Sequence, residues 1–88
     1  MSGPAVLNVG FYNFVLVDKI VALVNPDSAP MRRTVQNLRK TGRVIDVTQG
    51  RRTKAIIFTT NHEVILSAIS HETLAKRLTA GDALGDEE

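Results

Sequence analysis

The hydrophobic positions of this chain fall into short runs that predict strands, separated by two segments with helical spacing. Strand-forming runs cover residues 5–9, 14–24, 43–47, 53–59 and 63–69. Gly10 to Asn13 marks the first turn or bulge, with Gly and Asn supplying the awkward backbone angles, and residues 60–62 predict a hairpin. The resulting order is β-β-α-β-β-β-α, an α+β domain.

The run over 14–24 is apolar in both of its alternating rows of side chains. A strand with two apolar faces needs cover on both faces. In so short a chain, we expect part of that cover to come from another subunit. Asp18 and Lys19 interrupt the run, which predicts a bulge or a surface edge.

The first helix is expected to begin near Pro30, with Asp27 or Ser28 as its cap, and to end at Gly42. Its apolar stripe consists of Met31, Val35 and Leu38, spaced by four and three residues. The opposite face is mostly basic and carries Arg32, Arg33, Gln36, Arg39 and Lys40.

The second helix is expected to follow Ser70, whose hydroxyl can cap it. Leu74 and Leu78 are predicted to face the core, whereas Lys76 and Arg77 are predicted to point outward.

Length and composition predict one domain over residues 1–80, followed by an acidic flexible tail over 81–88. Hydrophobic residues make up 43% of the 88 residues, which is enough for a packed core. The chain has no cysteine, which excludes disulfides and thiolate metal sites. Neither a membrane-spanning run nor a signal peptide is recognisable, so we expect a soluble cytoplasmic protein.

Charge is distributed unevenly along the chain, although the formal net charge is only +2. Residues 32–54 contain eight of the eleven basic residues and Asp46 as their only acid, which gives a local charge of +7. The remainder of the chain carries −5. Nucleic acid, with its dense phosphate charge, is the commonest partner for such a segment.

Within this basic segment, a polar stretch over 48–53 lies between two predicted strands. Gln49 and Gly50 signal a turn, since glycine tolerates positive φ. Arg51 and Arg52 follow, and each guanidinium presents a planar fork that fits phosphate oxygens. We interpret the stretch as a binding site for a polyanion. The alternative is that two exposed arginines only increase solubility.

Enzymatic chemistry finds little support in the sequence. His62 and His71 lack a third ligand at metal-binding spacing, and Asp46 and Glu63 lack a paired nucleophile or base. We expect Asp46 to pair with a nearby arginine instead. Phosphate-binding and dinucleotide motifs are absent. The sequence therefore predicts no enzyme, no metal or other cofactor, and no small-molecule substrate.

The aromatic content bears on the type of nucleic acid. Aromatic residues make up 5% of the chain, and Phe58 is the lone aromatic near the basic segment in sequence. Single-strand binders stack bases on several aromatic rings. Contacts to the backbone of duplex DNA fit this composition better, with minor-groove or guanine contacts open to arginine.

Several segments resemble the RemA family, the bacterial extracellular matrix regulatory proteins. The matching segments are residues 8–10, 25–33, 50–55, 64–67 and 72–78, so the resemblance covers about residues 6–78. The motifs Pro-Asp-Ser-Ala-Pro and Gly-Arg-Arg-Thr in one short chain are quite specific. The acidic tail is not part of the shared pattern.

The resemblance implies a DNA-binding transcriptional regulator linked to biofilm matrix and osmoprotection genes. It also implies a ring-like homo-oligomer, in which repeated arginines contact double-stranded DNA. The family's contact arginines correspond to Arg51 and Arg52. A third contact, often arginine in the family, is Lys19 here, which keeps the charge but loses the bidentate fork. Arg32 and Arg33 are further candidate DNA-binding residues, and Arg39 and Arg43 extend the basic field.

Two other interpretations remain open at this point. The chain could be an oligomeric interaction scaffold whose basic face binds an acidic protein, including its own tail. It could also be an RNA-binding module.

Overall fold

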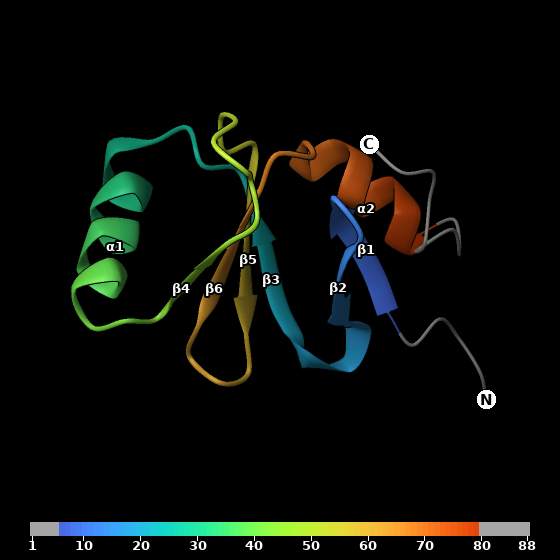
Figure 1. The fold of residues 1–88 in the computed structure, drawn as a ribbon, viewed down its shortest axis with the longest axis horizontal. Helices are drawn as coiled ribbons and strands as arrows, with labels where there is room; N and C mark the ends of the chain where they lie inside the picture. The colour runs from blue at the N-terminus through green and yellow to red at the C-terminus, as the bar shows by residue number, and fades with distance from the viewer. Residues whose placement is uncertain (1–5, 80–88) are drawn as a thin grey trace.

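The strands of the computed structural model, which describes residues 6–79, form two separate sheets (Figure 1). These strands are β1 (Val6–Gly10), β2 (Asn13–Leu16), β3 (Ile20–Val24), β4 (Val44–Asp46), β5 (Ala55–Thr59) and β6 (Val64–Ser67). The helices are a 3₁₀ helix (Val17–Lys19), α1 (Ala29–Lys40) and α2 (His71–Thr79). The α+β class is therefore confirmed, while the acidic tail expected at 81–88 lies outside the described residues.

The single strand predicted over 14–24 is wrong, because the chain turns at Val17–Lys19. There the backbone forms the 3₁₀ helix, closed by the N–H of Ile20 donating to the carbonyl of Val17. The segment before it, β2, pairs with β1, whereas the segment after it, β3, pairs with β5 in the other sheet. The exposed polar pair Asp18 and Lys19 lies in this turn. The observed order thus contains one more strand than expected.

The larger sheet has the strand order β3-β5-β6-β4. Neighbouring strands are antiparallel except β4 and β6, which are parallel. Its central strands β5 and β6 are buried on both faces, which is the property expected of the 14–24 segment. In β2, by contrast, Phe14 and Leu16 are 49% and 50% exposed. The predicted hairpin between β5 and β6 is confirmed, with the N–H of Thr59 donating to the carbonyl of Glu63.

Hydrophobic side chains form one core on each face of this sheet. Ala55 and Ile57 of β5 pack on one side with residues of β1, β2 and α2. Ile56, the residue between them, points to the other side and packs with the apolar stripe of α1. Figure 1 shows this arrangement, with α1 on one side of the sheet and the β1–β2 hairpin and α2 on the other.

The ends of α1 follow their sequence signals. The hydroxyl of Ser28 accepts a hydrogen bond from the N–H of Met31 at 3.1 Å and caps the helix. At the other end Gly42 has φ +73°, and the N–H of Arg43 donates to the carbonyl of Leu38. This is a Schellman ending, which requires the left-handed conformation at the glycine position.

The predicted burial of α2 is right for Leu74 but wrong for Arg77. Ser70 caps the helix by accepting from the N–H of Thr73 at 3.1 Å. Arg77 is only 7% exposed, and its guanidinium donates to the main-chain carbonyl of Asn8 at 3.0 Å. The side chain therefore ties α2 to β1 and adds no charge to the surface. No helix within residues 6–79 is long and apolar enough to cross a membrane.

Candidate nucleic-acid interface

Residues 48–54, here called the arginine loop, pass over the carboxyl-terminal end of β6. On one side of β6 the N–H of Val47 donates to the carbonyl of Leu66 at 3.1 Å. On the other side the N–H of Lys54 donates to the carbonyl of Ser67 at 2.8 Å. Consecutive carbonyls of a strand point to opposite sides, so β6 holds both ends of the loop. The loop is a connection between non-adjacent strands, unlike a hairpin.

The first half of the loop is shaped by Asp46 at the end of β4. Its carboxylate accepts from both the N–H and the hydroxyl of Thr48, at 2.9 and 2.7 Å. These hydrogen bonds lower the pKa of Asp46, with a smaller contribution from Arg39 at 3.7 Å. The expected pairing of Asp46 with an arginine is thereby confirmed.

A tight turn then displays the two arginines. Gln49 and Gly50 both have positive φ, +54° and +81°, and the N–H of Arg51 donates to the carbonyl of Thr48 at 3.1 Å. Two successive left-handed residues are the pattern of a type I′ turn. Arg51 and Arg52 leave this turn in exposed positions, as the Gln-Gly signal predicted.

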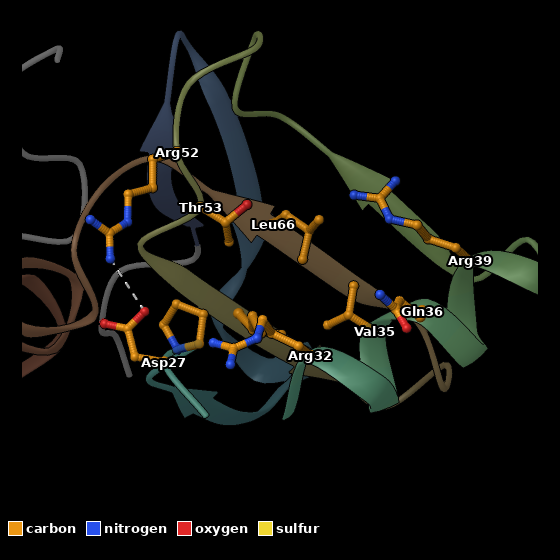
Figure 2. A pocket seen from close by; sticks show the side chains of 10 residues that line it. Asp27, Arg32, Val35, Gln36, Arg39, Arg52, Thr53 and Leu66 are labelled. Atoms are coloured by element: carbon orange, nitrogen blue, oxygen red, sulfur yellow. Dashed lines mark ion pairs between the residues drawn. The ribbon is translucent and has the colours of Figure 1, made fainter. Parts of the chain in front are cut away.

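The two adjacent arginines have different neighbours. The guanidinium carbon of Arg51 lies 4.7 Å from the ring centroid of Phe11, in the turn between β1 and β2. Arg52 faces the other way, toward the start of α1, where its guanidinium lies 3.5 Å from a carboxylate oxygen of Asp27 (Figure 2). Arg51 is therefore positioned by the hairpin and Arg52 by the segment before α1.

The turn that supports Arg51 has an unusual backbone. Phe11 and Tyr12 both have positive φ, +55° and +61°. Bulky residues rarely adopt this conformation, which usually selects Asn and Gly. The side-chain amide of Asn13 stabilises the turn by donating to the carbonyls of Gly10 and Phe11 at 2.9 and 3.3 Å. Awkward backbone angles were expected at Gly and Asn. Gly10 adopts one, with φ +111°, whereas Asn13 does not, and Phe11 and Tyr12 adopt the others.

Gly10 has its own reason to be glycine, because its φ of +111° is one that residues with a side chain rarely adopt. Space alone does not require glycine, since a Cβ atom there would make an ordinary van der Waals contact of 3.4 Å with Cδ1 of Ile69. Tyr12, in the same turn, is 74% exposed.

The structure brings Arg32 close to the arginine loop but separates Lys19 from it. Arg32 and Arg52 line one pocket, whereas Arg33 is exposed on α1 outside that pocket. The carbonyl of Lys19 accepts from the N–H of Thr60, beyond the far end of β5. Since Thr60 is six residues beyond Lys54 along β5, Lys19 lies about 20 Å along the sheet from the end of the loop at ~3.3 Å per residue.

Sequence analysis did not predict the two residues that contact the loop arginines. Phe11 is forty positions from Arg51, and nothing in the local pattern connects the two. Asp27 was interpreted only as a helix cap, a role that belongs to Ser28. Its carboxylate instead faces Arg52, and its N–H donates to the side-chain oxygen of Asn25 at 2.9 Å. The adjacent Phe-Tyr pair in a predicted turn was the one local sign of an aromatic surface.

Comparison with known proteins gives a consistent result. A family model described as RemA-like, extracellular matrix regulatory protein A-like, matches residues 6–78. A relative from Nitratidesulfovibrio vulgaris (strain DP4), named "Putative regulatory protein", is 51% identical over 82 residues, covering 93% of this chain and 95% of the relative. A similarly named protein of Synechococcus elongatus is 52% identical, with 92% and 95% coverage. One from Clostridium botulinum is 47% identical, with 97% and 96% coverage.

Proposed function

Because the chain belongs to the RemA-like family of regulatory proteins, we propose that it regulates transcription by binding duplex DNA through the arginine loop. The observation that carries this proposal is the way the loop displays Arg51 and Arg52. Both are exposed on a turn whose two ends are hydrogen-bonded to β6, in a segment with a net charge of +7. By family resemblance we extend the proposal to biofilm matrix and osmoprotection genes, and we propose a cytoplasmic location for the same reason.

Arginine is suited to this role because its guanidinium makes bidentate contacts with phosphate oxygens and guanine edges. The loop needs little further ordering when DNA binds, since Asp46 and Thr48 already fix its first half. Stacking on Phe11 restricts Arg51 in the same way. Preorganised side chains lose less conformational entropy on binding. Arg32, Arg33, Arg39 and Arg43 add to the positive field around this contact.

We further propose that the protein binds DNA as a homo-oligomer. Phe14 and Leu16 lie on one outer face of β2 and are about half exposed, as is typical of residues that pack against a second copy. Repetition of the arginine loop multiplies the contacts to one duplex. It also allows Lys19, at the far end of the sheet, to contact a different part of the same DNA.

Duplex binding measured against salt concentration tests the proposal. Wild type and an Arg51→Ala/Arg52→Ala double variant are compared, with the molar mass of each sample recorded. If both arginines contact phosphates, the log–log salt slope falls by roughly 2 per engaged protomer in the variant. The matched control is Lys40→Ala/Lys76→Ala, which removes the same charge from exposed positions outside the loop.

Loss of binding by the loop variant, at unchanged mass and with the lysine control still active, supports the proposal. Equal losses of DNA affinity in the loop variant and the lysine control would mean that net charge alone determines DNA binding. If wild type does not bind duplex DNA even at low salt, the loop binds another partner, and an acidic protein becomes the leading alternative.

A further inference from the structure

A pocket of about 400 Å³ lies between α1 and the four-stranded sheet, beside the arginine loop (Figure 2). Three guanidinium groups from separate places line it. Arg32 comes from the first turn of α1, Arg39 from its last turn, and Arg52 from the loop. A volume of several hundred Å³ is typical of small-molecule sites.

The rest of the pocket offers both apolar and polar contacts. Val35, Ile56 and Leu66 contribute apolar surface from α1, β5 and β6. Gln36 and Thr53 contribute an amide and a hydroxyl. Within residues 6–79 neither of these side chains is engaged in a hydrogen bond, so both are available to a ligand. A few polar groups around an apolar surface is the usual composition of a specific binding site.

Charge selects the class of ligand. Among residues 6–79, Asp27 is the one acid that lines the pocket, against three arginines, so this part of the chain gives the lining a net charge of +2. Guanidinium forks bind phosphate in bidentate fashion, and the apolar surface suits a compact ring. We propose that this pocket binds an organic phosphate of the size of a nucleoside monophosphate. Its phosphate contacts Arg32 and Arg52, and its ring packs on Val35 and Leu66.

The pocket and the proposed DNA contact share Arg52. Its present partner, the Asp27 carboxylate at 3.5 Å, is highly exposed and makes a weak ion pair. A bound phosphate replaces this carboxylate and holds Arg52 toward α1. Arg51 lies against Phe11 and is not part of the pocket. Bound ligand therefore removes one of the two arginines from DNA, and DNA equally weakens the ligand. This coupling rests on the proposed function, whereas the pocket itself does not.

The first experiment titrates the full-length protein with adenosine 5′-monophosphate and phenyl phosphate, followed by backbone amide NMR. Adenosine and inorganic phosphate are the two fragments used for comparison. We expect the organic phosphates to shift the amides of Gln36, Thr53 and Leu66, and each fragment to bind at least about tenfold more weakly. No saturable shift at millimolar organic phosphate overturns the proposal. Equal affinity for inorganic phosphate alone also overturns it, since the apolar surface would then play no part.

Two neighbouring arginines of α1 provide a matched pair of variants. Arg32→Ala removes a guanidinium that lines the pocket, while Arg33→Ala removes an exposed one that does not. We expect Arg32→Ala to weaken the binding of adenosine 5′-monophosphate about tenfold or more, because a charged hydrogen bond to the phosphate is lost. The second should change the affinity less than twofold. Equal effects would show nonspecific attraction by the basic helix and would contradict the pocket.

A third arm separates failure of the pocket from failure of DNA binding. Arg51→Ala should bind the nucleotide like wild type, whatever happens to DNA. If wild type binds DNA, saturating nucleotide should weaken that binding severalfold, and Arg32→Ala should abolish the effect. Nucleotide that binds the pocket without changing DNA affinity overturns the coupling. If the protein binds nucleotide but does not bind DNA, the proposed pocket is supported and only the proposed DNA-binding function is refuted.

Discussion

At the scale of single residues, the contact between Arg51 and Phe11 gives a direct prediction. Phe11→Leu keeps an apolar side chain but removes the ring face beneath the guanidinium. An exposed cation–π contact contributes about 0.5–1 kcal/mol. We expect DNA affinity to fall two- to fivefold, less than in Arg51→Ala.

A double-mutant cycle checks the cause. In Phe11→Leu/Arg51→Ala the effect of the first substitution should vanish, since no guanidinium remains to be held. Additive losses would show that Phe11 contacts DNA by itself. Fluorescence anisotropy with a labelled duplex measures all four proteins at one salt concentration.

Arg77 gives a prediction about stability. Its guanidinium is buried and donates to the carbonyl of Asn8. Arg77→Met keeps much of the side-chain volume but leaves a buried acceptor without this donor. We expect the free energy of unfolding to fall by about 1–3 kcal/mol. Lys76→Met, one residue earlier and exposed, should stay within about 0.5 kcal/mol of wild type in the same urea titration.

Sequence reasoning worked at this scale where a residue acts on its own neighbourhood. Gly42 and Gly50 were assigned correctly, and Ser28 was one of the two expected caps, because capping and turn formation depend on nearby backbone. Arg77 and Phe11 were missed because their partners are 69 and forty positions away. A guanidinium at the end of a predicted helix is normally exposed, and no local signal indicates a distant carbonyl.

At the scale of elements, the strained turn between β1 and β2 predicts a trade between stability and binding. Two bulky residues with left-handed φ cost about 1–2 kcal/mol each. Such strain often persists because it positions functional groups. Replacement of Phe11-Tyr12 by Asn-Gly, the preferred pair for this turn, should raise the melting temperature and weaken DNA binding at least about fivefold.

The turn between β5 and β6 offers the control. His62 has φ +63° but lies at the end of the sheet away from the arginine loop. His62→Gly relieves comparable strain, so it should stabilise the fold without changing DNA affinity. A β1–β2 turn variant that gains stability and keeps full affinity would show that the aromatic turn is not retained for binding.

The arginine loop gives a prediction about pH. Hydrogen bonds from Thr48 lower the pKa of Asp46 below its unfolded value of 3.8. The ionised form therefore stabilises the folded state above about pH 4, and this contribution disappears as pH falls through the lower, folded value. Because the carboxylate is 43% exposed, we expect less than about 1 kcal/mol.

Denaturation of wild type and Asp46→Asn between pH 7 and 2.5 measures this contribution. The stability of wild type should fall toward that of the variant as pH drops below 4. Thr48→Val, which removes the hydroxyl donor and keeps the N–H, should show an intermediate slope. Parallel curves over the whole range would contradict the prediction.

Element prediction succeeded wherever a run of residues had one role. The prediction of one strand over 14–24 failed because a continuous hydrophobic run does not reveal that its two halves belong to different sheets. Val17–Lys19 turns the chain, and the two halves then pair with different partners. Pairing is a tertiary property, so the order β3-β5-β6-β4 and the loop across β6 were not accessible from pattern alone.

At the scale of the whole molecule, the outer face of β2 predicts the link between assembly and DNA affinity. Phe14→Ser/Leu16→Ser replaces two half-exposed apolar side chains, so it should lower the molar mass toward the protomer. Loss of repeated contacts should weaken DNA binding at least about a hundredfold, since avidity contributes ~10²–10⁴. Light scattering and binding on the same samples measure both quantities.

Arg51→Ala/Arg52→Ala is the comparison variant, because it should lose DNA affinity while it keeps the molar mass of the oligomer. A β2 variant that remains an oligomer would contradict the assignment of this face. A monomeric variant with undiminished affinity would contradict the role of avidity.

The path of the chain over β6 also determines when the arginine loop can take its shape. Ribosomes release residues 48–54 before Leu66 and Ser67, whose carbonyls anchor the loop. The loop therefore leaves the ribosome without a fixed conformation, because its partners in β6 have not yet been synthesised. A further anchor comes from the start of α2, where the N–H of His71 donates to the carbonyl of Lys54. Nascent chains and products truncated before β6 cannot form the loop. The arginine loop therefore reaches its DNA-binding conformation only after β6 and the start of α2 have been synthesised, as a consequence of topology alone.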